Sequence, residues 1–149
     1  MTKAASTGAR TRARELLLQA LYQQQIAGHD GDELLLQFKE QTAYARVDQS
    51  FFNESLAAIC ASQSALEKTL EPLIDRPIEQ LDPVEKSILL IGVFELQSKA
   101  DVPYRVVINE GVNLAKRFGA LDGHKYINAC LDKAAQDLRS TEVQAQGSG

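Results

Sequence analysis

Apolar residues recur every three or four positions along most of this chain, which is the spacing of a helix that buries one face. The first such segment runs from about Arg10 to Ile26 and ends before Gly28, and a shorter one follows at about residues 33–41. Their inward stripes comprise Ala13, Leu17, Ala20, Leu21 and Gln24 in the first segment and Leu34, Leu35 and Phe38 in the second. Alternating patterns typical of strands are missing, so the sequence predicts an all-α fold.

The middle of the chain predicts one long helix. It begins after Asp48, a residue type that favours the N-cap position. Steps of three and four keep its apolar residues on one face, and these are Phe52, Leu56, Ile59, Leu66, Leu70 and Leu73. Pro72 and Pro77 mark its end, because proline cannot continue a helix interior.

The last part of the chain predicts three further helices. They are a helix opened by Asp82 and Pro83, one from about Pro103 to Phe118, and one from about Gly123 to Leu138. Residues 88–94 of the first are apolar on every side, so we expect that helix to be central. Gly111 lies inside the second and costs about 1 kcal/mol relative to alanine, and nothing in the sequence explains it.

These helices predict a single domain of two three-helix lobes. The lobes cover about residues 10–75 and 82–139, joined near Arg76 to Leu81. Residues 1–9 and 140–149 are mostly small and polar, and we expect both to be disordered tails. No apolar stretch is long enough to span a membrane, and residues 1–9 lack the apolar region of a signal peptide. A cytoplasmic protein without membrane contact is expected.

Catalytic and metal-binding chemistry has little support in the sequence. Cys60 and Cys130 each lie in an apolar helical pattern, which favours buried thiols over a disulfide. His29 lies in a loop of glycine and aspartate, and no glycine-rich phosphate loop is present. We therefore expect no enzyme activity, metal, cofactor or small-molecule substrate.

Basic charge is concentrated at the start of an otherwise acidic chain. The formal net charge is -4, yet residues 1–14 contain four basic residues and no acid. Arg10, Arg14 and Tyr22 follow one another at multiples of four along the first helix, with Arg12 between the first two. Arginines in a first helical turn oppose the helix dipole, which favours another use for them. That use is phosphate binding, although a solvated helix start remains the plainer alternative.

A second basic and aromatic pair opens the last helix. Lys125 and Tyr126 lie where free backbone amides also favour an anion. Asp122 precedes them, and we expect it to cap the helix and to lie close to any bound phosphate. Cations beside aromatic rings suit unpaired RNA, because charge binds phosphate and rings stack on bases. A surface lysine beside a core tyrosine is the alternative.

Several strings spread over about residues 8–138 share the pattern of one known family. They are Arg10–Glu15 with Gln19–Tyr22, Asp48–Phe52, Val84–Lys86, Phe94–Leu96, Asp101–Val106, Ile108–Glu110, Leu114–Lys116, Lys125–Asn128 and Leu131–Ala134. On these strings the chain resembles the NusB family of bacterial transcription antitermination factors. Two residues depart from the pattern of this family. Thr11 interrupts what is often a fuller arginine run, and Tyr126 stands where many relatives carry phenylalanine.

The resemblance implies an all-helical fold of two three-helix bundles and a function without catalysis. It implies binding to the single-stranded boxA element of ribosomal RNA leaders and to NusE, a small-subunit ribosomal protein, within an antitermination complex on RNA polymerase. The implied RNA surface comprises Arg10, Arg12, Arg14, Tyr22, Glu79, Lys125 and Tyr126. The implied NusE surface lies on the helices that begin near Glu85 and Tyr104.

Two other functions stay open at this point. NusB-like helical domains also precede RNA cytosine methyltransferase domains, and that alternative needs a downstream catalytic domain with a nucleophilic cysteine. A protein-interaction bundle without RNA binding is the other alternative. The arginine string and the Lys125–Tyr126 pair argue against it.

Overall fold

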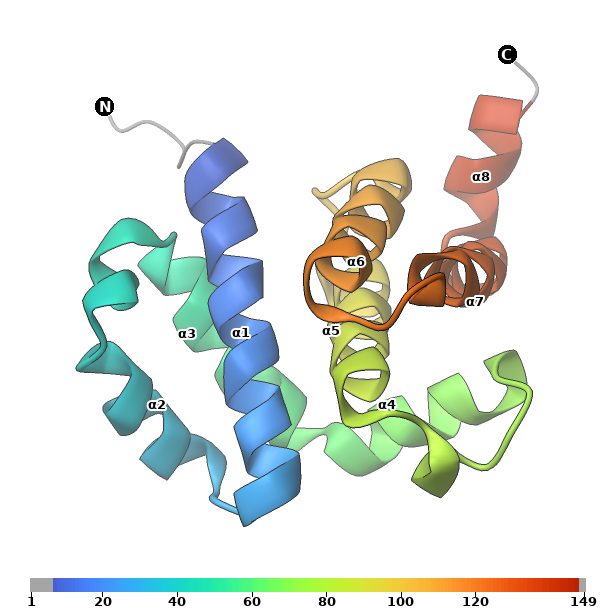
Figure 1. Ribbon diagram of the computed structural model, residues 1–149. Helices are drawn as coiled ribbons and strands as arrows, with labels where there is room; N and C mark the ends of the chain where they lie inside the picture. Colours follow the sequence, from blue (N-terminus) through green and yellow to red (C-terminus); the bar gives the residue numbers. More distant parts are fainter. Residues whose placement is uncertain (1–6, 148–149) are drawn as a thin grey trace. The chain divides into compact units, whose positions relative to one another are not determined.

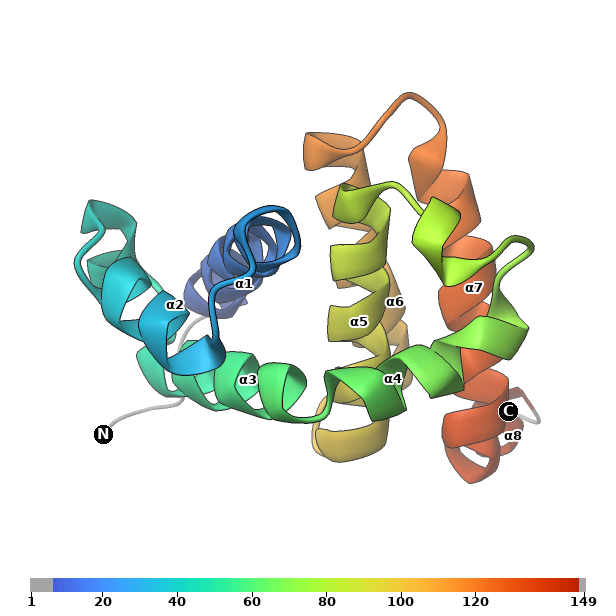
Figure 2. The same cartoon turned by 90° about the horizontal axis from the view of Figure 1, so that it is seen from below.

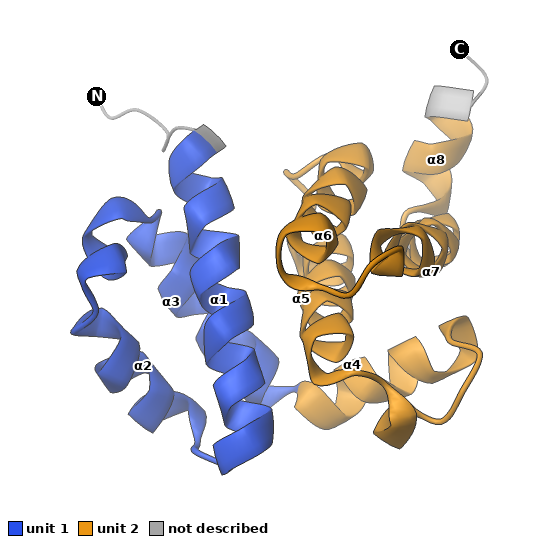
Figure 3. Cartoon of the chain, viewed as in Figure 1, with its two compact units in different colours: residues 1–62 blue, residues 63–149 orange. Residues whose placement is uncertain are grey.

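A computed structural model shows the architecture of the chain and describes residues 7–147 (Figure 1). Every regular element within this range is helical, which confirms the all-α prediction. The chain divides into two compact units, residues 1–62 and residues 63–149 (Figure 3). The division therefore lies at Ser62, and the predicted joint near Arg76 to Leu81 is wrong.

The first unit is a bundle of three α-helices. Its elements are α1 (Thr7–Ala27), α2 (Gly31–Lys39), the short 3₁₀ helix η1 (Thr42–Arg46) and α3 (Gln49–Ala61). α1 starts before Arg10, so residues 7–9 are helical and the prediction of a tail there is wrong; residues 1–6 lie outside the described range. Gly28 ends α1 with a φ of 74°, a conformation that glycine adopts without strain.

The core of this first unit contains the predicted stripes except for Gln24 and Leu35, which are only half-buried. The buried residues include Ala13, Leu17, Ala20, Leu21, Leu34, Phe38, Phe52, Leu56 and Ile59. The Phe52 ring packs against Phe38 and Tyr44, with centroid distances of 6.4 and 5.9 Å. The Asp48 carboxylate accepts a hydrogen bond from the Phe51 N–H at 3.1 Å, which confirms Asp48 as the N-cap of α3.

The predicted long middle helix is broken at Ser62. The Ser62 backbone leaves helical geometry with φ of −119° and ψ of 24°, and its N–H still bonds the Ala58 and Ile59 carbonyls. A new helix, α4 (Gln63–Leu70), follows and ends in η2 (Glu71–Leu73). All six residues of the predicted stripe are buried, but they now belong to two units. Because the stripe keeps its spacing across the break, hydrophobic periodicity alone could not show it.

The second unit is built around α5 (Pro83–Ser98), as the apolar run predicts. The remaining elements are η3 (Ile78–Gln80), α6 (Tyr104–Phe118), α7 (Gly123–Leu138) and α8 (Ser140–Gly147). All of residues 87–96 of α5 are buried. α5, α6 and α7 pack against one another, and α4 runs across α5 (Figures 1 and 2). The Asp82 carboxylate caps α5 by accepting from the Val84 and Glu85 N–H groups.

Gly92 and Gly111 explain how these three helices approach so closely. A Cβ atom on Gly92 of α5 would lie 2.5 Å from Leu131 Cδ2, and one on Gly111 of α6 would lie 2.6 Å from Leu131 Cδ1. Leu131 of α7 is fully buried and fills the space that both glycines leave open. Gly111 therefore has a packing role, which the sequence could not reveal because the partner lies on another helix.

Arg139, at the end of α7, joins four segments of the second unit. Its guanidinium donates to the carbonyls of residues 95, 96, 99 and 102 at 2.7–3.1 Å, which satisfies the C-terminal end of α5. It also donates to Glu142 of α8 at 2.6 Å. The second Glu142 oxygen accepts from the Tyr104 N–H at 3.0 Å and so caps α6. Both contacts hold the pKa of Glu142 below its usual value.

The expectation of a disordered tail from residue 140 is therefore wrong for residues 140–147. Helix α8 carries few apolar residues, so its composition resembles that of a solvated tail. Its order comes instead from the polar bonds of Arg139 and Glu142, which composition does not show.

We expect Arg139→Lys to lower the free energy of unfolding by about 3 kcal/mol, because an ammonium group cannot reach all these acceptors and the carbonyls of Leu96 and Val102 lose the donor that Arg139 supplies. Urea unfolding followed by circular dichroism measures the change. Arg46→Lys, at an exposed arginine, is the matched control. Equal stability of the two variants would contradict the role assigned to Arg139.

Candidate nucleic-acid interface

The arginine string of α1 contacts the start of α3. The Arg10 guanidinium forms an ion pair with Asp48, with Nη2 3.1 Å from Oδ2, and its Cζ lies 4.4 Å from the centre of the Phe51 ring. Arg12 is exposed, and its Nε donates to the Arg46 carbonyl at 2.8 Å. Because α1 begins at Thr7, these arginines lie beyond the first helical positions, and the argument from the helix dipole loses force.

Arg14 is not a surface residue. It is 3 % exposed, and its Cζ lies 5.1 Å from the centre of the Phe51 ring. Its guanidinium packs inside the first unit, so the expectation that all three arginines present their charge to RNA is wrong for Arg14. Arg12 and the outer part of Arg10 remain accessible.

Tyr22 is the aromatic residue of α1 that the sequence links to RNA. It is 43 % exposed, and Ile26, one turn further along α1, is also exposed. A tyrosine this accessible offers a ring on which a base could stack. The first unit thus places one basic group, at Arg12, and one open ring, at Tyr22, on the same helix.

The start of α7 places Lys125 and Asp122 close together. Lys125 is 74 % exposed at its side chain, and its Nζ lies 3.7 Å from Asp122 Oδ1. Asp122 has a φ of 64°, in the left-handed region, and its side chain caps no backbone N–H group. The prediction that Asp122 is a side-chain cap is therefore wrong. Its carboxylate instead lies beside the cation that the sequence assigns to RNA.

The Tyr126 ring is partly covered. The Arg76 Cζ lies 4.7 Å from the ring centre, and the Tyr126 hydroxyl is buried without a well-formed hydrogen bond to any described residue. Burial, with Cys130 and Asp75 nearby, raises the pKa of Tyr126 to about 12. The sequence-based hypothesis of a freely stacking ring must therefore take Arg76 into account. Arg76 belongs to no sequence motif, so it is not among the site residues that the sequence predicts. Only the fold brings it to Tyr126.

Two acidic positions complete the predicted set. Glu79 is exposed on η3. Glu85 is partly buried at the start of α5, where burial and the neighbouring Asp82 raise the pKa of its carboxyl group. A Cβ on Gly123 would lie 3.0 Å from Glu85 Oε2, so α7 begins close against this carboxylate. Glu85 thus lies close to the start of α7. It also lies on α5, one of the helices on which the family resemblance places the surface for NusE.

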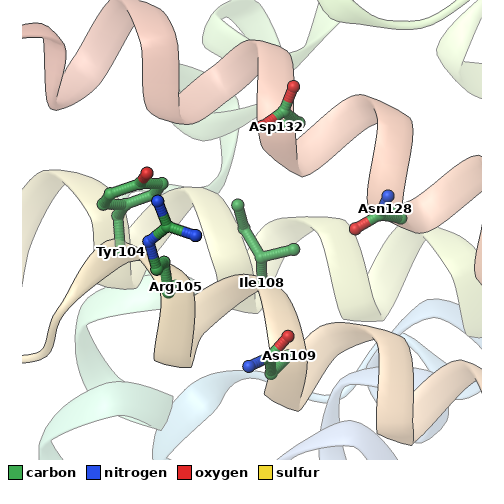
Figure 4. Close-up of a pocket in the computed structure, with 6 residues that line it drawn as sticks. All are labelled: Tyr104, Arg105, Ile108, Asn109, Asn128 and Asp132. Atoms are coloured by element: carbon green, nitrogen blue, oxygen red, sulfur yellow. The ribbon is translucent and has the colours of Figure 1, made fainter. Parts of the chain in front are cut away.

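Tyr104 lies at a hollow between α6 and α7. The hollow has a volume of about 230 Å³, and its lining comprises Tyr104, Arg105, Ile108, Asn109, Asn128 and Asp132 (Figure 4). Tyr104 itself is buried, so the accessible groups are mainly the amides and charges around it. Opposite charges on its two helices, Arg105 and Asp132, favour a protein partner here over the uniformly anionic backbone of RNA.

The described residues show no arrangement typical of a catalyst. Among residues 7–147, no group of three or more histidine, cysteine, aspartate or glutamate side chains is placed to hold a metal ion. Cys130 is buried as predicted, Cys60 is only half-buried, and both are free thiols. Burial raises the pKa of both, which disfavours the nucleophilic thiolate. In the same range, no helix combines the length and apolar character needed to cross a bilayer.

Comparisons with known proteins agree with this geometry. The chain is 47 % identical over 143 residues to the transcription antitermination protein NusB of Pseudomonas entomophila, which covers 96 % of this chain and 86 % of the relative. It is also 47 % identical to the protein of the same name from Hydrogenovibrio crunogenus, over 92 % of this chain and 85 % of the relative. The solved structure of T. maritima NusB matches with a TM-score of 0.78 at 23 % identity, covering 91 % of this chain and 93 % of that one, and so supports the fold. Because the model of the NusB family also matches residues 11–136, the chain belongs to the NusB family.

Proposed function

We propose that this chain is a transcription antitermination protein that binds the single-stranded boxA element of ribosomal RNA leaders. The observation that carries the proposal is the 47 % identity over almost the whole chain to a relative named for transcription antitermination. The chain spans 86 % of that relative's length, which favours this function over a module of a longer RNA methyltransferase.

RNA binding is supported by the presence of a cation and an aromatic ring in each unit. In the first unit these are Arg12 and Tyr22 on α1. In the second, Lys125 and Tyr126 open α7. Separate basic and aromatic groups suit an extended single strand, which can follow a surface and turn its bases onto rings. We assign Arg10 to the margin of the site in the first unit, and Glu79 and Asp122 to the margin of the site in the second unit.

We further propose NusE as a protein partner, with the RNA polymerase antitermination complex as the larger assembly. The partly buried Glu85 and the α6–α7 hollow at Tyr104 are the features that support a protein contact. A role in bacterial transcription would place the chain in the cytoplasm. No step of this function requires catalysis by the chain.

A binding titration tests the function directly. We expect the full chain to bind a fluorescently labelled boxA RNA more tightly than a scrambled RNA of the same length and composition. Addition of NusE should strengthen the boxA complex, because two proteins that bind one RNA and each other do so cooperatively. Fluorescence anisotropy measures both affinities. Equal affinity for the two RNAs, with and without NusE, would overturn the proposal.

Arg12 and Arg14 should respond differently to alanine substitution. We expect Arg12→Ala to reduce the slope of log affinity against log salt by about 0.7, the value for one lost phosphate contact on a single strand. Arg14→Ala should instead lower the free energy of unfolding by roughly 1–3 kcal/mol, because a buried side chain is removed. Salt titrations and urea unfolding of each variant separate the effects. An unchanged salt slope in Arg12→Ala, with an unchanged fold, would remove Arg12 from the interface.

We expect Asp122→Asn to tighten RNA binding, most strongly at low salt where charges are least screened. The substitution removes a negative charge beside Lys125, and asparagine tolerates the left-handed backbone of this position. No cap is lost, so the melting temperature should stay constant. Asp132→Asn, an equal charge change further along α7, is the matched control. Weaker binding by Asp122→Asn would instead mean that the carboxylate accepts a hydrogen bond from RNA.

A further inference from the structure

Arg76 is held in a fixed place between an acid and an aromatic ring. It lies in the loop between η2 and η3, where its Nε donates to Asp75 Oδ1 at 2.7 Å and its Nη2 donates to Asp75 Oδ2 at 3.2 Å. Its Cζ lies over the Tyr126 ring, and its side chain is still 40 % exposed. Two hydrogen bonds and a cation–π contact together fix the guanidinium group.

This arrangement changes what Tyr126 can offer. One face of its ring is covered by Arg76, and its hydroxyl is buried. The ring is therefore better placed to support another group than to receive a base on the covered face. The group that it supports is planar and cationic, and its side chain is 40 % exposed.

We propose that Arg76 is an RNA-contacting residue of this surface: a base stacks on the outer face of its guanidinium, and Tyr126 supports it from the other side. The inference rests on the proposed RNA-binding function. Arginine planes stack on unpaired bases, and the N–H groups not bonded to Asp75 can reach a phosphate or a base edge. The ligand is thus a single unpaired nucleotide within the RNA strand.

Stacking, rather than charge alone, is the larger part of this contact. Acidic groups lie around the positive charge of Arg76, with Asp75 bonded to it and Glu85 close enough to interact with it electrostatically. Such a mixed field attracts phosphate only weakly. The planar shape of the guanidinium is not offset by these neighbours, so the shape of residue 76 should matter beyond its charge.

Three variants of Arg76 and Tyr126 separate shape from charge. Arg76→Lys keeps the charge and loses the plane, and we expect at least about fivefold weaker binding of boxA RNA with the salt slope retained. Arg76→Ala loses both, so its affinity should fall similarly or further, and its salt slope should flatten by less than the roughly 0.7 of a full phosphate contact, because Asp75 offsets part of the charge. Tyr126→Ala removes the ring that supports the guanidinium, so it should also weaken boxA binding while the salt slope is retained.

Arg105→Ala is the matched control. Arg105 also lies over a tyrosine, with its Cζ 5.3 Å from the Tyr104 ring centre, but at the opposite end of α6 from the loop that leads into α7. The Arg105→Ala substitution removes one positive charge, as Arg76→Ala does, and it also breaks an arginine–tyrosine contact. We expect it to change boxA affinity by less than the Arg76 variants do.

An abasic scan identifies the stacked nucleotide. Replacing one base at a time in the boxA RNA by an abasic sugar should give one position at which the unchanged chain binds more weakly. On that RNA, Arg76→Lys should cause no further loss, because the base that stacks on the guanidinium is already gone. Circular dichroism of each variant checks that the fold is retained.

Three results would overturn the inference. Tighter binding by Arg76→Ala would mean that Tyr126 itself receives the base and that Arg76 covers it. Full affinity in Arg76→Lys would leave only a charge contact, and unchanged affinity in both variants would remove Arg76 from the interface. In each case the unchanged chain still binds boxA RNA, so the proposed function survives. Failure of the unchanged chain to bind would overturn both.

Discussion

The close approach of α5, α6 and α7 around Leu131 is the constraint on which the second unit depends. Leu131 occupies the space left by Gly92 and Gly111, and a methyl group at either glycine would collide with it. This contact fixes α7 against α5 and α6 along its length, and hence the direction in which its first turn presents Lys125 and Tyr126. The surface at the start of α7 is thus set by packing one to two turns away, in a fully apolar environment.

Polar contacts complete what this apolar packing begins. Arg139 supplies side-chain donors to the carbonyls at the end of α5, and the α6 N–H at Tyr104 is satisfied by Glu142 from α8. Apolar side chains cannot satisfy such groups, so the ends of the bundle need a guanidinium with several donors and a carboxylate with two acceptors. The hydrophobic pattern decides which helices pack together, and a few charged residues decide how their ends are closed.

Local and periodic features of the sequence were enough for α1, α2, α5, α6 and α7 and for most of the buried residues. The caps at Asp48 and Asp82 and the stripes of α1, α3 and α7 follow from neighbours within four residues, which a single sequence displays. Long-range contacts were not accessible in this way. The break at Ser62 leaves the apolar spacing intact, and the Arg14–Phe51 and Arg76–Tyr126 pairs join residues 37 and 50 positions apart. The resemblance to the NusB family supplied the site residues, but it could not show that Arg14 is buried.

A common arrangement links the arginines of both units and has a consequence for RNA recognition. Arg10 lies between Asp48 and Phe51, and Arg76 lies between Asp75 and Tyr126. In each case an acid cancels part of the charge, which weakens the long-range attraction of phosphate, while acid and ring together restrict the side chain. A restricted side chain loses less conformational entropy when a ligand binds. In the RNA contact that we propose, arginines held in this way attract every polyanion less strongly, and stacking on the guanidinium planes becomes the selective part of the contact. The proposed site would then select an unpaired strand over duplex nucleic acid, since only unpaired bases can reach a fixed plane.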